Sequence, residues 1–243
     1  MKQNKYDDDD FFRLYKEMPR SQFGLEAAGE WHILKQLIPS LENKHVLDLG
    51  CGFGWHCQYA LEQGASQVIG VDISQKMLEQ AQSLVKDKRL TYKQQSIEEI
   101  DFPNECFDVI ISSLAIHYVK DLKALVQKAM KMLTDGGVFV VSVEHPIFTA
   151  LPNQDWYYNE DGEKLHWPVD RYQDEGVRET SFLTNNVIKY HRTLSTYINT
   201  LTAVGFVIKE IQESKPTLEA MEHDKEMKDE MRRPMFLLIK AIK

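Results

Sequence analysis

The stretch HVLDLGCGFGW, residues 45–55 of this 243-residue chain, decides the fold that we expect. Its apolar beginning is typical of a buried parallel strand. Three glycines, Gly50, Gly52 and Gly54, follow at alternate positions, and a helical pattern starts after them. Glycine tolerates positive φ and, without a side chain, allows a ligand to lie against the backbone. The stretch therefore predicts a strand, a ligand-binding turn and a helix whose first turn offers free N–H groups.

The spacing of these glycines argues against a dinucleotide site. The dinucleotide fingerprint is G-x-G-x-x-G, in which the third glycine allows the helix to pack closely on the strand. Trp55 stands at that third position, and this disfavours a nicotinamide-dependent oxidoreductase. The observed pattern is G-x-G-x-G, and it is preceded by an acid, Asp48.

The segment VLDLGCGFG resembles the first motif of the class I S-adenosylmethionine-dependent methyltransferases, in particular the small-molecule, methyltransferase type 11-like members. In that family the glycine loop passes under the methionine part of the cofactor. The acid two residues before the first glycine, here Asp48, helps to hold the cofactor's ammonium group. The resemblance implies S-adenosyl-L-methionine as cofactor and S-adenosyl-L-homocysteine as product. A cationic amino acid accounts for an acid in this loop, whereas a pyrophosphate would not.

A second acid, Asp72, ends the next apolar run at 68–71. In nucleotide-type α/β sites an acid about 20 residues beyond the glycine loop binds the ribose hydroxyls. Asp72 could instead cap the following helix, but Ser74 is the better cap. We therefore assign the ribose contact to Asp72. The glycine turn alone is a weak signal, and the turn, the spacing and the second acid together are a strong one.

Further cofactor contacts follow from the same resemblance. The loop at 95–100 reaches the adenine in the family, usually with an acid where Ser96 stands, so the serine is a departure. Ser96 and Glu99 also match a capping box, which is the structural alternative. The full set of expected cofactor-binding residues is Tyr15, Arg20, Asp48, Gly50, Cys51, Gly52, Asp72, Ile73, Met77, Ser96, Ile97, Ser113, Leu114 and His117.

The N-terminal residues 1–40 are expected to form a helical lid. Methyltransferases of this class often carry such a lid over the cofactor, and Tyr15 and Arg20 would serve in it. Arg20 could bind the cofactor carboxylate through a bidentate hydrogen bond. The alternative is a helix that packs on the sheet edge. The acid run at 7–10 is most simply a solvated face.

The order of apolar segments predicts an α/β fold, with a Rossmann-like seven-stranded, mostly parallel sheet, helices on both faces and an aromatic insertion after the fifth strand. The whole chain, 1–243, is expected to be a single methyltransferase domain. Strands are expected near 46–49, 68–72, 90–95, 107–113, 138–143, 206–208 and 235–242. Helices are expected near 25–38, 55–63, 74–86, 121–133, 193–204 and 217–233.

The insertion at 147–191 interrupts the alternation of strands and helices. Connections this long in a compact domain are usually functional lids or binding loops. We expect a lid over the substrate, and the alternative is a small added subdomain or a dimer contact. The segment is rich in rings, namely Trp156, Tyr157, Tyr158, His166, Trp167, Tyr172, Tyr190 and His191.

Three histidines are candidates for a catalytic base or for a group that orients the acceptor, because methyl transfer to oxygen or nitrogen releases a proton. His145 ends the fifth strand beside Glu144 and is ranked first. His117 follows the fourth strand and comes second, and His191 at the end of the insertion comes third. A hydrogen-bonded structural role is the alternative for each.

Composition restricts the possible partners. A net charge of −8 disfavours a broad surface for nucleic acid or anionic membrane. The three cysteines, Cys51, Cys57 and Cys106, show no metal or redox spacing, which fits a reducing cytoplasm. No apolar run approaches the length of a membrane span. We expect a cytoplasmic monomer or homodimer that binds no metal.

The expected function is methyl transfer from S-adenosylmethionine to a small-molecule acceptor by in-line displacement. The chain lacks the Asn/Asp-Pro-Pro-aromatic sequence of many nucleic-acid amino-methyltransferases, and this weakens that activity. The alternative is a non-catalytic cofactor-binding module that acts through protein partners. The residues do not name the acceptor.

Overall fold

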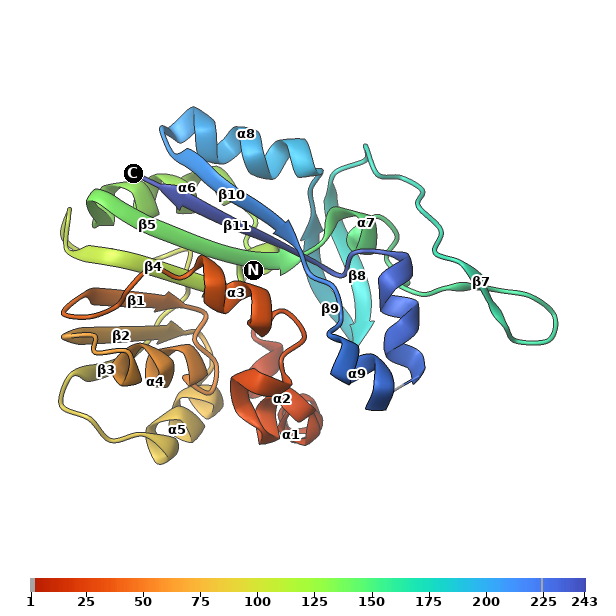
Figure 1. Ribbon diagram of the computed structural model, residues 1–243, viewed down its shortest axis with the longest axis horizontal. Coiled ribbons are helices and arrows are strands. Elements are labelled where there is room, and N and C mark those ends of the chain that lie inside the picture. Colours follow the sequence, from red (N-terminus) through yellow and green to blue (C-terminus); the bar gives the residue numbers. More distant parts are fainter. Residues whose placement is uncertain (1–2, 224) are drawn as a thin grey trace.

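The computed structural model describes residues 3–223 and 225–243. Their centre is a seven-stranded sheet with the order β10-β11-β5-β4-β1-β2-β3 (Figure 1). Only β11 runs against the others, because it pairs antiparallel with both β5 and β10. The mostly parallel sheet expected from the sequence is confirmed. Its strands are β1 (His45–Leu49), β2 (Gln67–Asp72), β3 (Leu90–Gln94), β4 (Phe107–Ser113), β5 (Leu133–Glu144), β10 (Val207–Glu213) and β11 (Phe236–Ile242).

Helices cover both faces of this sheet (Figure 1). Side chains alternate between the faces along a strand, so Val109 and Ile111 of β4 share one buried cluster while Ile110 belongs to the other. The cluster around Val109 and Ile111 includes side chains of α3 (Trp31–Leu37), α4 (Trp55–Glu62) and α5 (Gln75–Leu84). The opposite cluster includes side chains of α6 (Leu122–Met132) and α8 (Leu194–Val204).

The strand order reverses between β1 and β4. The chain builds β1, β2 and β3 toward one edge of the sheet and then returns to add β4 and β5 on the other side of β1. Loops leaving the carboxyl ends of β1 and β4 therefore diverge, and a ligand crevice is expected between them.

The N-terminal segment consists of short helices: η1 (Lys5–Asp7), α1 (Asp9–Glu17), α2 (Pro19–Gln22) and η2 (Gly24–Ala27). The helix expected from residue 25 begins only at Trp31, because Ala28 takes extended backbone angles (φ −89°, ψ 121°). The expectation of a fully solvated acid run is wrong for Asp7. Its carboxylate accepts hydrogen bonds from Ser74 Oγ (2.6 Å) and Lys76 N (3.1 Å) at the start of α5, where a helix favours negative charge.

The segment after β5 forms α7 (Pro146–Thr149) and two hairpins, β6 (Tyr157–Tyr158) with β7 (Lys164–His166), and β8 (Gly176–Phe182) with β9 (Thr184–His191). The first hairpin projects away from the sheet in Figure 1. The helix expected at 217–233 is an α-helix, α9 (Leu218–His223), and a 3₁₀ helix, η4 (Lys225–Arg232). No helix among the described residues is long and apolar enough to span a membrane.

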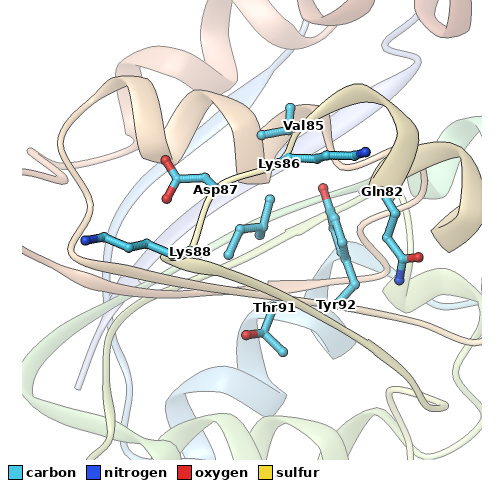
Figure 2. Close-up of a pocket in the computed structure, with 8 residues that line it drawn as sticks. Gln82, Val85, Lys86, Asp87, Lys88, Thr91 and Tyr92 are labelled. Carbon is cyan, nitrogen blue, oxygen red and sulfur yellow. The ribbon is translucent and has the colours of Figure 1, made fainter.

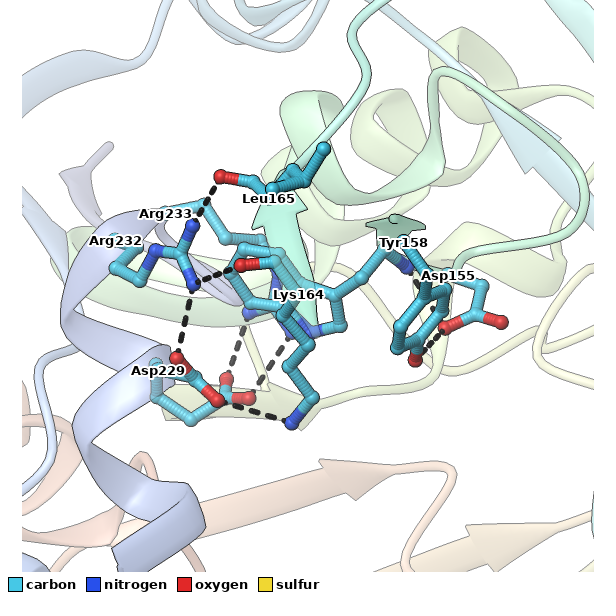
Figure 3. A network of polar contacts seen from close by, with 9 residues as sticks. Asp155, Tyr158, Lys164, Leu165, Asp229, Arg232 and Arg233 are labelled. Atoms are coloured by element: carbon cyan, nitrogen blue, oxygen red, sulfur yellow. Dashed lines mark hydrogen bonds and ion pairs between the residues drawn. The ribbon is translucent and has the colours of Figure 1, made fainter. Parts of the chain in front are cut away.

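Polar contacts fasten the first hairpin to η4 (Figure 3). Lys164 Nζ lies 3.0 Å from Asp229 Oδ2, and Arg232 donates to the backbone oxygens of Lys164 and Leu165. The Arg233 guanidinium lies 4.2 Å from the centre of the Trp167 ring. These contacts connect the outer part of the insertion to the segment that leads into β11.

Candidate active site

The glycine turn after β1 requires glycine for two reasons. Gly50, Gly52 and Gly54 have φ values of +77°, +53° and +76°, a region that other residues adopt only at a cost. A Cβ at Gly50 would lie 2.4 Å from Ala115 Cβ, and one at Gly54 would lie 2.0 Å from the Tyr92 hydroxyl. The turn therefore lies too close to the loop after β4 at Gly50, and to Tyr92 of β3 at Gly54, to leave room for a side chain.

A cavity of about 860 Å³ opens at the carboxyl edge of the sheet. It is bounded by the N-terminal segment, the turns after β1 to β4, and parts of the insertion and of the segment before β11. All the residues expected to bind cofactor line this cavity except Asp48: Tyr15, Arg20, Gly50, Cys51, Gly52, Asp72, Ile73, Met77, Ser96, Ile97, Ser113, Leu114 and His117. Their roles as cofactor ligands remain predictions.

Asp72 is held in place by backbone donors. Its Oδ2 accepts from Gly52 N and its Oδ1 from Ser74 N, both at 2.9 Å. Ser74 is the cap of α5, as expected, because its Oγ accepts from Met77 N. Burial raises the pKa of Asp72 above its ordinary value. The two backbone bonds fix the carboxylate at the cavity wall, in an orientation that leaves lone pairs for hydroxyl groups.

Asp48 does not fit the contact with an ammonium group that the resemblance implies. It is buried beneath the glycine turn and is absent from the cavity wall. Its Oδ2 accepts from Cys57 Sγ at 3.4 Å, and its Oδ1 has no partner among the described residues. Burial raises the pKa of Asp48 to about 7, so its carboxyl group is not fully ionised at neutral pH.

The loop after β3 is a turn and not a helix. Ser96 Oγ accepts from Glu98 N at 3.3 Å, and Ser96 O accepts from Glu99 N at 2.9 Å. The capping-box interpretation is therefore wrong, because no helix begins at Ser96. Ser96 and Ile97 both line the cavity, and their contact with an adenine stays a prediction.

Of the three candidate histidines, only His117 lines the cavity. It is buried, and its Nδ1 has no partner among the described residues. Burial lowers the pKa of His117 to about 4, so the imidazole is neutral at pH 7. Leu114, three residues before His117, has φ +52°, a strained conformation of the kind found at functional sites.

His145 and His191 have structural hydrogen bonds and lie outside the cavity wall. His145 Nε2 lies 2.9 Å from Glu213 Oε1, and its Nδ1 accepts from Ile147 N. His191 Nδ1 lies 2.8 Å from Thr149 Oγ1, and its Nε2 lies 2.9 Å from a backbone oxygen. This geometry favours His117 over His145, the expected first candidate, because neither His145 nor His191 lines the cavity.

The sequence reasoning missed a cluster of polar side chains in the cavity wall around Glu144. Glu144 Oε1 accepts from Lys189 Nζ at 2.6 Å, and its Oε2 accepts from Gln154 Nε2 at 3.0 Å. All three side chains line the cavity, and Lys189 is only 1% exposed. Glu144 ends β5 directly before His145, and neighbouring strand residues point in opposite directions. The position of Glu144, an acid at the end of a strand, was the sequence signal that could have indicated a residue of the cavity wall.

A second hollow, of about 650 Å³, lies beside β3 and the end of α5. Figure 2 shows its wall, which includes Gln82, Asp87 and Tyr92. None of the residues expected to bind cofactor or acceptor lines this hollow. The chemistry is therefore assigned to the larger cavity.

Comparison with known proteins identifies the family. A protein-family model described as a methyltransferase domain matches residues 47–141 of the sequence. A Listeria monocytogenes crystal structure, assigned as an S-adenosylmethionine-dependent methyltransferase, is 49% identical, covers 89% of this chain and 99% of its own, and has a TM-score of 0.84. The crystal structure of an S-adenosylmethionine-dependent methyltransferase from Mesorhizobium loti is 41% identical, covers 90% and 100%, and has a TM-score of 0.85. An uncharacterised protein from Haemophilus influenzae is 36% identical over 98% of this chain and 96% of its own.

The chain therefore belongs to the S-adenosylmethionine-dependent methyltransferases, a family of enzymes. The expected cofactor is confirmed as the cofactor of this family. The names of partial matches differ in acceptor. A ubiquinone biosynthesis O-methyltransferase from Bradyrhizobium diazoefficiens matches over 40% of this chain and 38% of its own, and a tRNA U34 carboxymethyltransferase from Histophilus somni over 59% and 48%.

Proposed function

We propose that this enzyme methylates a small-molecule acceptor enclosed beside the cofactor. The observation that carries the proposal is the extent of the cavity. It continues past the residues expected to bind cofactor onto Glu144, Gln154 and Lys189. A volume of about 860 Å³ lies within the range of pockets for cofactors and small ligands. The net charge of −8 also opposes a nucleic-acid acceptor.

In this proposal two segments cover the reactants. Residues 1–40 contribute Tyr15 and Arg20 to the cavity wall, and residues 147–191 contribute Gln154 and Lys189. When bound, S-adenosylmethionine would supply an electrophilic methyl group on a positively charged sulfur, placed for in-line attack by the acceptor. The protein's part is to hold the two reactants in line and to exclude water.

His117 has the role of an acceptor-orienting residue in this scheme. A pKa of about 4 makes it a weak base, while its unpartnered Nδ1 provides a hydrogen-bonding atom in the cavity. A neutral imidazole can accept a hydrogen bond from an acceptor O–H or N–H. It would thereby direct the acceptor lone pair toward the methyl group.

The function is tested by incubating the enzyme with cofactor labelled in its methyl group. Separate reactions contain a library of small metabolites, total tRNA, and total protein. We expect label only in a small-molecule product. Label in tRNA or protein would overturn the proposed acceptor class, and cofactor binding without any transfer would favour the non-catalytic alternative.

Replacing Asp72 tests the ribose contact. Asp72→Ala should weaken S-adenosylhomocysteine binding by about 1–3 kcal/mol, because charge-assisted hydrogen bonds are lost. Calorimetry measures the change, and Asp135→Ala, at a carboxylate that is 93% exposed, is the control. Unchanged affinity in Asp72→Ala would show that the ribose assignment is wrong.

Replacing His117 tests the orienting role once an acceptor is known. His117→Ala should lower kcat about ten- to hundredfold, the equivalent of one lost hydrogen bond of about 1–3 kcal/mol. Wild-type kcat should show no histidine step near pH 6–7, because His117 becomes protonated only as the pH falls toward a pKa of about 4. His45→Ala, at the exposed amino end of β1, is the control. Normal turnover in His117→Ala would exclude the role.

A further inference from the structure

We propose that Glu30 and Arg20 together recognise the amino-acid end of S-adenosylmethionine, Glu30 by accepting from the ammonium group and Arg20 by donating to the carboxylate. This inference rests on the proposed function, since it concerns the same cavity. It replaces Asp48, which does not line the cavity. It also gives a reason for the position of the N-terminal segment.

The carboxylate of Glu30 has one oxygen that lacks a partner. The residue directly precedes α3 and is only 1% exposed. Its Oε1 accepts from Arg20 Nη2 at 3.1 Å and from Ser113 Oγ at 3.2 Å. Its Oε2 is buried without any hydrogen-bond partner among the described residues. A buried acceptor left unsatisfied is costly, so a donor supplied by a ligand would stabilise the site.

Both members of the pair face the cavity. Among the described residues, Arg20 donates one hydrogen bond, from Nη2 to Glu30. A guanidinium has five N–H donors in a planar fork. Burial alone lowers the pKa of Arg20, but the Glu30 carboxylate raises it to a net value above normal. The guanidinium therefore stays charged and retains donors for a second carboxylate.

The position of Glu30 agrees with the order of the expected contacts along the sheet edge. Along the sheet edge, Ser96 follows β3, Asp72 ends β2, the glycine turn follows β1, and Ser113 ends β4. A ligand with its base near Ser96 and its ribose at Asp72 must extend its other end past β1 toward β4. That end carries the ammonium and carboxylate groups, and Ser113 is the residue that binds Glu30.

The surroundings favour a zwitterion over a single charge. Glu30 contributes one negative and Arg20 one positive charge at 3.1 Å from each other. His56 also lines the cavity, but burial lowers its pKa to about 4, so it is neutral at pH 7. An amino acid presents the complementary pair of charges on adjacent groups. The competing explanation is an ion pair that only fastens the N-terminal segment to the fold.

Three ligands separate these explanations by calorimetry. S-adenosylhomocysteine carries both charged groups, its decarboxylated analogue lacks the carboxylate, and methylthioadenosine lacks both. Glu30→Gln should weaken the first two about ten- to hundredfold, the loss of one charge-assisted bond, and leave methylthioadenosine unchanged. Arg20→Gln should weaken only S-adenosylhomocysteine. Glu17→Gln is the control, on the same segment but 61% exposed and outside the cavity wall.

The inference is overturned if Glu30→Gln weakens all three ligands equally, because that result reports a distorted fold. It is also overturned if none is weakened. Thermal unfolding of each unliganded variant identifies a folding defect. Because the measurement is binding, the result stays decisive even if no acceptor is methylated. The proposed function can then fail while this inference holds.

Discussion

Replacing Lys189 by methionine should destabilise the protein by about 3–5 kcal/mol, the usual cost of leaving one buried charge without its partner. Lys189 is 1% exposed, and its ammonium group binds Glu144 at 2.6 Å and Gln154 at 3.3 Å. It also lies over the Phe182 ring. Urea unfolding measures the change. Lys44→Met, in a half-exposed ion pair with Asp108 at 3.7 Å, should cost less than about 1 kcal/mol.

The destabilisation should depend on pH. Burial raises the pKa of Glu144, but Lys189 and other partners bring it to a net value below normal. The stability from the ionised pair is therefore present above the unfolded pKa of roughly 4.3. It is lost as the pH falls through the lower folded value. In Lys189→Met the ionised carboxylate of Glu144 has no positive partner. Protonation of this carboxylate at low pH removes the unpaired charge. The difference in the free energy of unfolding between variant and wild type should therefore become smaller as the pH falls.

The double variant Lys189→Met/Glu144→Gln shows whether the pair causes the effect. Removing both charges should recover most of the stability lost in Lys189→Met, since no uncompensated ion remains. Equal stability of Lys189→Met and wild type, at neutral pH, would contradict the prediction. The same variants should lose turnover while retaining cofactor affinity, because the pair lies where we propose that the acceptor binds.

Replacing Gly50 by alanine should combine two costs. Its φ of +77° is unfavourable for alanine by about 1–2 kcal/mol. The new methyl group would also lie 2.4 Å from Ala115 Cβ, and such overpacking adds about 1–3 kcal/mol. Movement of the turn should in addition abolish measurable S-adenosylhomocysteine binding. Urea unfolding and calorimetry measure the two effects.

Two matched variants separate strain from overlap. Gly162→Ala has a nearly identical φ of +79°, with no atom within 4 Å of the new Cβ, so it reports strain alone. Ala115→Gly in the Gly50→Ala background removes the overlapping methyl group. The double variant should be more stable than Gly50→Ala, by about the difference in free energy of unfolding between Gly50→Ala and Gly162→Ala. Equal stabilities of Gly50→Ala and Gly162→Ala would mean that the close approach contributes nothing.

Local sequence patterns determined the sheet and one side of the cavity. Apolar runs, glycine spacing and strand-end acids act within a few residues, because strand and turn conformations depend on neighbouring side chains. The turn at 50–54 and the acid Asp72 are therefore recognisable from the order of the amino acids alone. The resemblance to the family, and not a local pattern, led to the residues of the loops after β3 and β4, which the fold brings to the same cavity wall.

Only the tertiary structure decided which polar side chains face that cavity. At the end of β5 a difference of one residue separates Glu144, in the cavity wall, from His145, bonded to Glu213. The strand pleat reverses direction at each residue, and a sequence pattern does not show which side is open. Histidine chemistry favoured His145, but its side chain does not line the cavity.

Long-range pairing was equally beyond the sequence. Lys189 binds Glu144 from 45 residues away in the sequence. Asp7 accepts from Ser74, the cap of α5, across 67 residues. Arg20 and Glu30 are close in sequence, yet Glu30 also accepts a hydrogen bond from Ser113, which lies 83 residues away at the end of β4. Charged side chains have no local periodicity that selects their partners, since the energy of a pair depends on burial and distance in the folded chain.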